Sequence, residues 1–398
     1  MQTVLLAAGQ GTRMRPLTDH VPKPMLPVAG KPLLEHTATA AVEAGASRLI
    51  IVVGYEADVV TDHFGDELAG VPVTFVTQSE QRGTAHALRV AAPELDDGPF
   101  AVLNGDALYD VPSLATLYDR GPAVGSYRVD DPHLYGVLAT DETGDRLVDI
   151  VEKPADPPSN QVNAGAYVFP ASARDLLAVE ESERGEQELT DVLARVCERT
   201  AVAVVPFDSW LDVGRPWELL EANERRLGDV ERSIEGDVHD DADVRGAVVV
   251  EAGASVDAGA VVAGPAYLAS GVTVGPNAYV RGATYLAAGV HVGHGVEIKN
   301  SVVGRGTSVA HLSYVGDSVL GRDANVGAGT NVANLRHDEE PVTMVVRGER
   351  VSTGRRKFGV VAGDGVRTGV NTSLNPGVTL GSGATTTPGE TVFQGDER

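Results

Sequence analysis

Aliphatic residues recur at every sixth position over a long stretch in the second half of the chain. Between Val238 and Ile298, eleven consecutive positions at this spacing carry valine, leucine or isoleucine, with glycine and other small residues between them. An α-helix requires a period of 3.6 and a flat, half-buried strand a period of 2, so neither explains the pattern. A hexapeptide repeat does, because each six residues form one face of a triangular coil with the aliphatic side chain inside. We therefore predict an all-β parallel helix.

The repeat slips by one residue twice and is interrupted once. It continues after Ile298 through Val303, Val309, Val315, Leu320, Val326 and Val332, and it resumes at Val360, Val366, Thr372 and Val378. Known hexapeptide-repeat proteins of this kind are left-handed and commonly pack as trimers, so a left-handed β-helix and a homotrimer are expected. The interruption, at about 334–358, carries the basic residues Arg347, Arg350, Arg355, Arg356 and Lys357. A solvated loop and a site for phosphate groups on a sugar or CoA both fit this cluster.

The part of the chain from position 1 to position 230 shows a different pattern, in which apolar strand-like runs alternate with longer amphipathic segments. Such alternation predicts an α/β, Rossmann-like domain with a mainly parallel mixed sheet. The expected strands are 3–7, 48–53, 73–77, 100–103 and 203–206, and the expected helices include 33–44, 84–92 and 217–227. We therefore expect two domains, residues 1–230 with a helical linker at about 215–232, and residues 233–398.

The composition restricts the compartment and the partners. The formal net charge is −24, and five lysines stand against 27 arginines. An acidic surface with few lysines suits a high-salt cytoplasm, so a halophilic protein is expected, with an ordinary acidic mesophilic protein as the alternative. The charge argues against nucleic acid as a partner. The lone cysteine, Cys197, excludes an internal disulfide, fits a reducing cytosol and is expected to be a buried helix residue.

The sequence offers no segment for export or for crossing a membrane. Met1 leads directly into the first expected strand, so no signal peptide is predicted. No apolar stretch approaches the length of about 18 residues that a spanning helix requires. We therefore expect a cytoplasmic location without a membrane partner.

A glycine-rich loop follows the first expected strand and carries, in order, Gly9, Gly11, Thr12, Arg13 and Arg15. Glycine has no Cβ, so backbone N–H groups in such a loop can approach a polyphosphate closely. Arg13 and the later Lys23 can neutralise a triphosphate and the charge that develops on it during reaction. The pattern matches neither the P-loop nor the GxGxxG dinucleotide fingerprint.

The run LAAGQGTRMRPLT, followed by KPMLPVAGKPLLEH, resembles the signature of the sugar-1-phosphate nucleotidyltransferases. These enzymes join a nucleoside triphosphate to a sugar 1-phosphate and release pyrophosphate. The resemblance extends from the start of the chain to about position 215 and implies that Arg13 and Lys23 are catalytic. It further implies a nucleotide-binding set formed by Leu6, Ala8, Gly9, Gly11, Thr12, Gln78, Gly83 and Thr84.

Two further motifs indicate how the base and the metal would be bound. The segment 78–86 is similar to the uridylyltransferase pattern, and the Gln78 amide can pair with the imide edge of uracil or thymine. Asp106, at the carboxyl end of an expected strand, and Asp212 are hard oxygen ligands that suit Mg²⁺. Bacterial members with an acetyltransferase domain usually have asparagine at the second position, whereas Asp212 resembles the thymidylyltransferase branch. The choice between UTP and dTTP and the choice of sugar therefore stay open.

Short motifs between residues 135 and 165 resemble the family's sugar pocket. By that resemblance Glu152 contacts sugar hydroxyls, Gly136 and Asn163 the N-acetyl group, and Lys153 the phosphate. No covalent nucleophile is needed, because the sugar phosphate oxygen attacks the α-phosphorus directly. Catalysis then consists of positioning and charge neutralisation.

The block 310–317 and the following 325–330 resemble the acetyltransferase site of bifunctional N-acetylglucosamine-1-phosphate uridylyltransferases/glucosamine-1-phosphate N-acetyltransferases. The resemblance gives His311 the role of general base, for which an imidazole that titrates near neutrality is suited. It assigns substrate binding to Arg281, Lys299, Tyr314, Asn325 and Asn334, with acetyl-CoA as the donor. After Asn334 the chain has Leu335 and Arg336 where bacterial members have a Tyr-Asp pair, which leaves the amino sugar open.

These patterns predict a bifunctional enzyme with Mg²⁺ as cofactor and with UTP or dTTP, a hexose or hexosamine 1-phosphate and acetyl-CoA as substrates. The alternative is a monofunctional glucose-1-phosphate uridylyl- or thymidylyltransferase whose β-helix only forms a trimer. Asp212 favours the alternative, whereas Arg281, Lys299 and His311 oppose it. A third possibility, an assembly scaffold with a degenerate catalytic head, is disfavoured by the intact Arg13, Lys23, Asp106 and Asp212.

Overall fold

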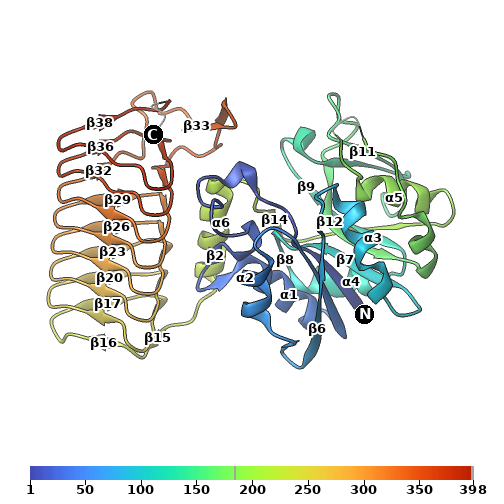
Figure 1. Cartoon of the computed structure of the whole chain (residues 1–398), viewed down its shortest axis with the longest axis horizontal. Coiled ribbons are helices and arrows are strands. Elements are labelled where there is room, and N and C mark those ends of the chain that lie inside the picture. Colours follow the sequence, from blue (N-terminus) through green and yellow to red (C-terminus); the bar gives the residue numbers. More distant parts are fainter. Residues whose placement is uncertain (183–184, 396–398) are drawn as a thin grey trace. The chain divides into compact units, whose positions relative to one another are not determined.

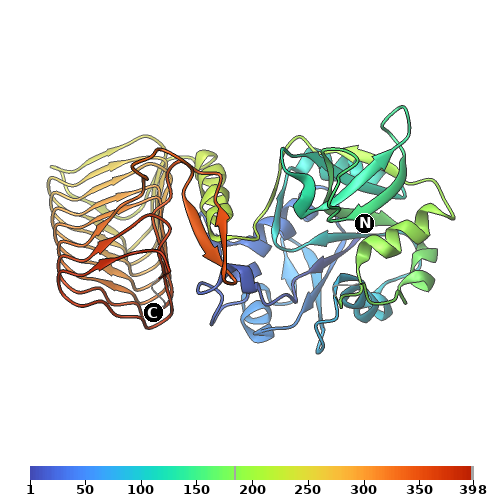
Figure 2. The same ribbon diagram turned by 90° about the horizontal axis from the view of Figure 1, so that it is seen from above.

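A computed structural model (Figures 1 and 2) describes residues 1–182 and 185–395. The chain divides into two compact units. The first unit comprises Met1–Gln10, Val21–Leu26 and Pro32–Asp212, and the second comprises Gly11–His20, Pro27–Lys31 and Val213–Arg398. The units are interleaved in sequence, and the contiguous division at about residue 230 stays a prediction. In the described part of the chain, no helix is long and apolar enough to cross a membrane.

The first unit is built on a mixed sheet with the strand order β11-β10-β12-β7-β1-β4-β6-β5. The four strands β7, β1, β4 and β6 are parallel, and β12 runs antiparallel to β7. Strand β9 pairs with β12 and carries β13 at its other edge. The strands are β1 Gln2–Leu6, β4 Arg48–Val53, β5 Glu67–Leu68, β6 Val71–Thr77, β7 Phe100–Asn104, β9 Ala123–Arg128, β10 Gly136–Thr140, β11 Leu147–Glu152, β12 Gln161–Phe169 and β13 Ala203–Pro206. The predicted α/β domain with a mixed sheet is confirmed, and its parallel part is the central run β7-β1-β4-β6.

Helices cover both faces of this sheet, because its central strands are apolar on both sides. Along β1, Leu5 contributes to one buried cluster and Val4 to the other. The first cluster includes side chains of α1 and α4, and the second includes side chains of α3 and α5. The helices are α1 Leu33–Glu43, α2 Ala57–Phe64, α3 Thr84–Ala91, α4 Val111–Asp119 and α5 Leu189–Cys197, with short 3₁₀ helices at η3 Ala92–Glu94, η4 Pro132–Leu134 and η5 Ala171–Leu176. Continuous apolar strands of this kind are typical of doubly covered parallel sheets.

The second unit contains three parallel sheets that form the faces of a left-handed β-helix, as predicted (Figure 1). The first face consists of β15 Ser233–Ile234, β18 Val248–Val250, β21 Ala266–Leu268, β24 Thr284–Leu286, β27 Val302–Val303, β30 Val319–Leu320, β35 Val361–Ala362 and β37 Thr379–Leu380. The second consists of β16 Asp237–Val238, β19 Ser255–Val256, β22 Thr273–Val274, β25 His291–Val292, β28 Ser308–Val309 and β31 Asn325–Val326. The third consists of β17 Asp243–Arg245, β20 Val261–Ala263, β23 Tyr279–Arg281, β26 Glu297–Lys299, β29 Tyr314–Gly316, β32 Asn331–Val332, β36 Ser373–Leu374 and β38 Thr391–Val392.

The residues of the six-residue repeat fill the interior of these coils. Val250 to Ile298 are at most 2% exposed at every repeat position, and the later aliphatic repeat residues belong to the same buried cluster. Thr372, the one polar residue of the repeat, is buried as well. At each slip in the six-residue repeat, one coil of the β-helix is one residue shorter than the others. The step from Val248 to its partner Ala266 is one position longer than the steps from Tyr285 to Val302 and from Val302 to Val319. The interior position is kept while a corner loses one residue.

The interruption of the repeat forms a two-stranded hairpin. Strand β33 (Thr343–Val346) pairs antiparallel with β34 (Glu349–Ser352), and the two residues between them are Arg347 and Gly348. Both have positive φ, 53° and 82°, as in the type I′ turn that fits the twist of a two-residue hairpin. Val342, Met344 and Phe358 at its base are buried. The insertion therefore folds onto the unit instead of forming a free loop.

Helix α6 (Pro216–Gly228) contacts β24 of the β-helix. Its buried Asn223 accepts a hydrogen bond from the backbone N–H of Ala29 at 2.8 Å and donates to the carbonyl of Pro27 at 3.2 Å. Segment 27–31, which includes the short strand β2 (Pro27–Val28), is thereby held to α6 within the second unit, and β3 (Lys31–Pro32) pairs with β2.

Candidate functional sites

Lys23 and Asp106 form a short ion pair in the first unit. The Lys23 ammonium lies 2.6 Å from Asp106 Oδ2, and the two side chains are 8% and 30% exposed. Lys23 lies in the 3₁₀ turn η2 (Lys23–Met25), and Asp106 follows β7. Gly105 permits this turn, since a Cβ there would lie 2.8 Å from the carbonyl of Leu6, which accepts a hydrogen bond from the Gly105 N–H. Two residues that the sequence assigned to catalysis and to metal binding thus lie together.

A small antiparallel pair of strands carries the second predicted metal ligand. Strands β8 (Ala107–Tyr109) and β14 (Trp210–Asp212) pair so that Asp212 lies opposite Ala107, the residue after Asp106. Burial raises the pKa of Tyr109, and both Asp106 and Asp212 raise it further, as carboxylates near the hydroxyl do. The pair therefore sets two carboxylates at one strand end. They are two hard oxygen donors, the kind that Mg²⁺ takes together with phosphate oxygens and water.

The residues expected to recognise the base are held by local hydrogen bonds. Gln78 is 5% exposed, and its amide donates to the carbonyl of Gly83 at 3.1 Å and to Nδ1 of His86 at 2.9 Å. Burial lowers the pKa of His86, so the neutral ring can accept this hydrogen bond. Gly83 has φ of 105°, and a Cβ there would collide with the backbone of Gln187. The Gln78 amide thus fixes the turn that leads into α3.

Gln81 joins this loop to the strand end at Leu6, a contact that the sequence reading missed. Its amide donates to the carbonyl of Ala8 at 2.9 Å. Thr84, at the start of α3, accepts a hydrogen bond from the N–H of Leu189 at 2.9 Å. At Gly9 a Cβ would meet nothing within 4 Å, so the space beside this glycine is open. Gln81 lies within the segment 78–86 that resembles the uridylyltransferase pattern, but the sequence assigned it no role of its own.

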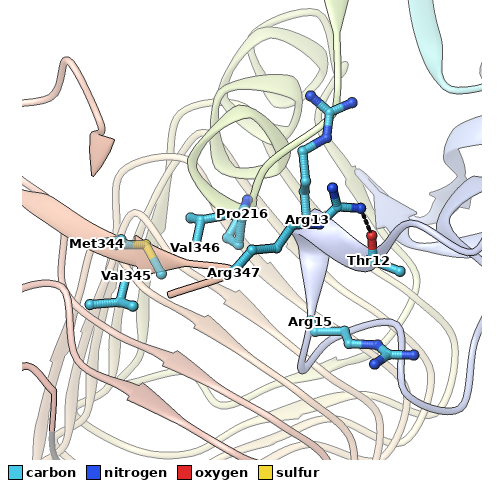
Figure 3. A pocket seen from close by; sticks show the side chains of 8 residues that line it. All are labelled: Thr12, Arg13, Arg15, Pro216, Met344, Val345, Val346 and Arg347. Carbon is cyan, nitrogen blue, oxygen red and sulfur yellow. Dashed lines mark hydrogen bonds between the residues drawn. The ribbon is translucent and has the colours of Figure 1, made fainter. Parts of the chain in front are cut away.

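The remaining residues of the glycine-rich loop lie in the second unit. Gly11 has φ of 63° and precedes the 3₁₀ turn η1 (Thr12–Met14), from which Arg13 and Arg15 are exposed. The hydroxyl of Thr18 donates to the carbonyl of Gly11 at 2.9 Å, and Asp19 accepts from Ser382 at 2.8 Å. A cavity of about 410 Å³ adjoins this turn (Figure 3). It is lined by Thr12, Arg13, Arg15, Pro216, Met344, Val345, Val346 and Arg347.

Three of the four residues expected to bind the sugar lie on neighbouring strands of the first unit, and Lys153 directly follows β11. Gly136 in β10 pairs with Glu152 in β11, and a Cβ on Gly136 would lie 3.0 Å from the Glu152 carboxylate. Val137 lies opposite Val162 of β12, which sets Gly136 and Asn163 at adjacent positions. Lys153, with φ of 46°, places its ammonium 3.4 Å from Glu152. Asn163 donates to the Tyr167 hydroxyl at 2.6 Å.

A buried carboxylate organises the predicted acetyltransferase residues. Asp317 is 2% exposed and accepts hydrogen bonds from Lys299 at 2.6 Å, from Asn300 at 2.9 Å and from Asn334. Asn334 also donates to the Tyr314 hydroxyl at 3.1 Å. Burial raises the pKa of Tyr314, and the Asp317 carboxylate raises it further. Lys299, Tyr314 and Asn334 are therefore brought together by Asp317.

Asp317 and its neighbour Asn300 were not predicted to be site residues, and the network extends beyond them. The amide of Asn300 also donates to Glu224 of α6 at 2.7 Å, and Glu224 forms an ion pair with Arg355. Asp317 has φ of 51°, as a residue at a coil corner. A short polar residue after Gly316 marks such a corner, but its sequence gives no sign that its carboxylate is buried.

Arg281 lies beside Lys299 because the coils stack in register. Arg281 pairs with Lys299, and Lys299 with Gly316, along the third face of the β-helix. The Arg281 guanidinium donates to Glu297 at 2.8 Å and lies 5.6 Å from the centre of the Tyr279 ring. Glu297 was not predicted, and it forms an ion pair with Arg281, one of the two cations assigned to the sugar phosphate.

His311 and Asn325 lie outside the Asp317 network. His311 is exposed on the corner between β28 and β29, and its imidazole makes no hydrogen bond or ion pair with the described residues. Asn325 is exposed in β31, on the second face of the β-helix, where it pairs with Ser308. Tyr314 and Lys299 belong to the third face. Within one chain, Asn325 is therefore on a different face from the other predicted binding residues.

The basic cluster of the insertion does not form one patch. Arg355 pairs with Glu224, Arg356 lies 3.2 Å from Glu339, and Arg350 donates to Gln394 at 2.7 Å. Arg347 donates to the hydroxyl of Thr12. The side chains of the cluster therefore have different partners, and a role in binding phosphate groups on a sugar or CoA stays a prediction.

Cys197 is the last residue of α5, as expected for a helix residue, but it is only partly buried. Burial raises the pKa of its thiol to about 11, so it is protonated near neutrality and poorly nucleophilic.

Comparisons with known proteins agree with both halves of the sequence. Residues 2–228 match the family "Nucleotidyl transferase", and residues 262–380 match the family "GMPPB C-terminal domain". The "Bifunctional protein GlmU" of Methanococcus vannielii is 40% identical over 394 residues, covering 96% of this chain and 92% of the relative. The "Bifunctional sugar-1-phosphate nucleotidylyltransferase/acetyltransferase" of Sulfurisphaera tokodaii is 36% identical over 400 residues, covering 98% of this chain and 97% of the relative.

A solved structure resembles the first half of the chain only. The crystal structure of a UDP-glucose pyrophosphorylase complexed with UDP-glucose superposes with a TM-score of 0.53 at 26% identity. It covers 57% of this chain and 98% of that protein. The similarity therefore agrees with the family match over residues 2–228 and does not extend over the β-helix.

Proposed function

The chain belongs to the nucleotidyl transferase family and, over nearly its whole length, to the bifunctional proteins named GlmU, and from this premise we propose that it makes a UDP-N-acetylhexosamine in two steps. Acetyl-CoA acetylates the amine of glucosamine 1-phosphate or galactosamine 1-phosphate. The product then reacts with UTP and releases pyrophosphate. The observation that carries the two-step proposal is the Asp317 network, which gathers Lys299, Tyr314 and Asn334 inside the β-helix half.

In nucleotidyl transfer, a phosphate oxygen of the sugar 1-phosphate attacks the α-phosphorus of UTP. The new P–O bond forms as the bond from the α-phosphorus to the pyrophosphate oxygen breaks, so no covalent enzyme intermediate is required. Arg13 and Lys23 neutralise the triphosphate and the charge on the departing pyrophosphate. Glu152 and Asn163 hold the sugar, with Gly136 leaving room beside Glu152, and Lys153 contacts its phosphate. The positioning of the reactants supplies much of the rate enhancement.

Asp106 and Asp212 are the residues that would hold Mg²⁺. The β8–β14 pair sets these two oxygen donors at one strand end, which fits an ion that takes one or two carboxylates with substrate phosphates. When bound, Mg²⁺ would withdraw charge from the phosphate groups of the substrates. Lys23 donates to Oδ2 of Asp106 and so orients that carboxylate.

In acetyl transfer, the amino group of the sugar attacks the thioester carbonyl carbon of acetyl-CoA. His311 accepts the proton from the nitrogen as the C–N bond forms, and CoA leaves as the thiolate when the C–S bond breaks. The imidazolium of His311 then returns the proton to the sulfur, which gives the thiol of CoA. Arg281 and Lys299 bind the sugar phosphate, and Tyr314 and Asn334 orient the sugar. Asn325, on the second face, contacts the acetyl group or the sugar from a neighbouring copy in the homotrimer that we propose.

One assay tests the two-step proposal. In molar salt, which suits the acidic composition, thiol release from acetyl-CoA is measured with glucosamine 1-phosphate and with galactosamine 1-phosphate. Pyrophosphate release is measured separately with UTP or dTTP and each acetylated product. Thiol release with either amino sugar supports the second active site. Its absence in a folded trimer would contradict it.

A monofunctional glucose-1-phosphate uridylyl- or thymidylyltransferase is the second candidate. It is favoured by Asp212, which stands where acetylating bacterial members usually have asparagine, and by the likeness of the first half to a UDP-glucose pyrophosphorylase. In that case pyrophosphate release would be faster with glucose 1-phosphate than with N-acetylglucosamine 1-phosphate, and no thiol would be released from acetyl-CoA.

A further inference from the structure

The tip of the β33–β34 hairpin contacts the glycine-rich loop within the second unit. The guanidinium of Arg347 donates a hydrogen bond to the hydroxyl of Thr12, although the two residues are 335 positions apart in the sequence (Figure 3). Figure 3 shows Arg13 and Arg15 extending from the same turn on either side of Thr12. All the residues that line the cavity at this contact belong to the second unit.

The backbone of the tip favours residues other than arginine. Arg347 occupies the first central position of the two-residue turn with φ of 53°. Asparagine, aspartate or glycine is preferred there, because an ordinary side chain is strained in the left-handed region. Arginine is therefore not at this position to form the turn, and its presence indicates that the guanidinium group has a function at the cavity.

The hairpin is held at its base, so the tip has a defined position. Met344 is 1% exposed and Val342 is fully buried. Gln394 donates to the carbonyls of Thr343 and of Pro376, the latter at 3.2 Å, and accepts from Arg350. These contacts fix β33 against the last coils of the β-helix and leave Arg347 at the cavity.

The charges around the cavity are unbalanced. Arg13, Arg15 and Arg347 line it, and no acidic residue of the described chain does. Arg15 has a long ion pair of 3.7 Å with Asp19, and the Arg347 guanidinium contacts a neutral hydroxyl. Other arginines of the insertion pair with carboxylates, as Arg355 does with Glu224. In a chain of net charge −24, three guanidinium groups without a lining carboxylate point to an anionic ligand with several oxygens.

We propose that Arg347 is a phosphate-binding residue of nucleotidyl transfer, supplied by the insertion of the β-helix. The proposal rests on the function proposed above, because Arg13 is assigned to the triphosphate there. Arg347 exchanges its hydrogen bond with Thr12 for the β- and γ-phosphates of the nucleoside triphosphate, and it holds the pyrophosphate product in the same way. The fork of its guanidinium suits two phosphate oxygens at once.

Replacement of Arg347 by asparagine tests the proposal, because asparagine keeps the turn and removes the cation. The dissociation constants of UTP and of inorganic pyrophosphate, each with Mg²⁺, are measured by calorimetry on the full-length protein. Loss of a charge-assisted hydrogen bond predicts a rise of about tenfold or more in both. The KM values of the sugar 1-phosphate and of acetyl-CoA should change less than twofold. Arg347→Lys keeps the positive charge but not the forked guanidinium. Its dissociation constants for UTP and pyrophosphate should lie between those of the wild type and those of Arg347→Asn.

Arg356→Asn is the matched control, because Arg356 is exposed and pairs with Glu339 away from the cavity. It should leave all four constants unchanged. Unchanged pyrophosphate affinity in Arg347→Asn, in a protein that melts at the wild-type temperature, would overturn the proposal. Faster turnover in this variant would also overturn it, since the tip would then obstruct the site. A rise in the KM of acetyl-CoA alone would also overturn the proposal, because Arg347 would then bind CoA and not the nucleotide. Pyrophosphate carries no base, so its binding does not depend on which nucleotide the enzyme uses. If the enzyme uses a nucleotide other than UTP, only the measurement with UTP would be affected.

Discussion

Each half of the molecule contains a short lysine–aspartate pair, and the two pairs differ in which partner is more accessible. Lys23 and Asp106 are 2.6 Å apart, with side chains 8% and 30% exposed. Lys299 and Asp317 are also 2.6 Å apart, with side chains 16% and 3% exposed. In the first pair the lysine is the buried partner, and in the second it is the aspartate. A lysine–aspartate pair thus exposes its carboxylate to solvent in the first half and its ammonium group in the second.

The difference agrees with the ligands proposed for the two sites. An accessible carboxylate at the end of β7 suits a cation such as Mg²⁺, whereas an accessible ammonium on the β-helix suits a sugar phosphate. In each case the buried partner orients the accessible one and offsets part of the cost of removing it from water. With only five lysines in the chain, two of them serve in such pairs.

The largest effect expected is that of metal removal, which should separate the two sites. Chelation with EDTA should reduce pyrophosphate release below detection, because Asp106 and Asp212 would lose the ion that withdraws charge from the phosphates. Thiol release from acetyl-CoA should stay unchanged, since the acetyl transfer proposed above relies on His311 and on no metal ligand. The two assays are run in parallel, and re-addition of Mg²⁺ is the control. Loss of both activities would show that the halves do not work separately.

Replacement of His311 by alanine should reduce acetyl transfer and leave nucleotidyl transfer intact, the reverse of the effect of metal removal. Acetyl transfer should fall by about 10²- to 10⁴-fold, the usual contribution of a general base, and nucleotidyl transfer should be retained. Steady-state kinetics of both reactions measure the change. His294→Ala is the matched control, because His294 occupies the preceding coil corner and is assigned no role. If a folded His311→Ala protein loses both activities, the two-site model fails.

The stability of the ligand-free protein should depend on which lysine is removed. Lys299→Met leaves Asp317 buried with only amide donors and should cost about 3 kcal/mol of the free energy of unfolding. Lys23→Met leaves Asp106 partly hydrated and should cost about 1 kcal/mol. Urea unfolding at constant high salt compares the two variants. Equal losses would mean that the difference in exposure between the pairs has no energetic consequence.

The smallest effect is expected for Tyr314→Phe. The substitution removes one neutral hydrogen bond, from Asn334, and should raise the KM of the amino sugar by about two- to tenfold. Burial and the Asp317 carboxylate raise the pKa of Tyr314 above its usual value of 10, so this hydroxyl stays protonated throughout the neutral range. The variant should therefore leave the pH profile of acetyl transfer below pH 9 unchanged. A new titration in that range would contradict the assignment.

Much of the fold could be predicted from sequence because its causes are local. Strands β4 and β13 begin and end where the apolar runs do, and α1, α3 and α6 lie within one residue of the predicted ends. The six-residue period predicted the β-helix, since every coil must bury one aliphatic residue on each face. Even the slips had a local cause, as they are coils shortened by one position at a corner.

The candidate sites were predicted only in part. Lys23, Asp106 and Asp212 were identified from motifs, and the structure brings Lys23 to Asp106 and sets Asp212 on the strand beside it. Asp317, Asn300, Glu297 and Gln81 were missed, because a lone acid or amide in a loop has the same sequence signature whether it is exposed or buried. Only the stacking of coils decides that Asp317 is 2% exposed and accepts three hydrogen bonds.

The sequence by itself determined the two architectures and the chemical types of most site residues, because hydrophobic periodicity and strand-end motifs act over short distances along the chain. Tertiary structure alone decided which partner of each lysine–aspartate pair is accessible. It also decided that Arg347 donates a hydrogen bond to Thr12, which is 335 positions away in the sequence. Solvent exposure and long-range contacts depend on how whole strands and coils pack, and no local pattern encodes that.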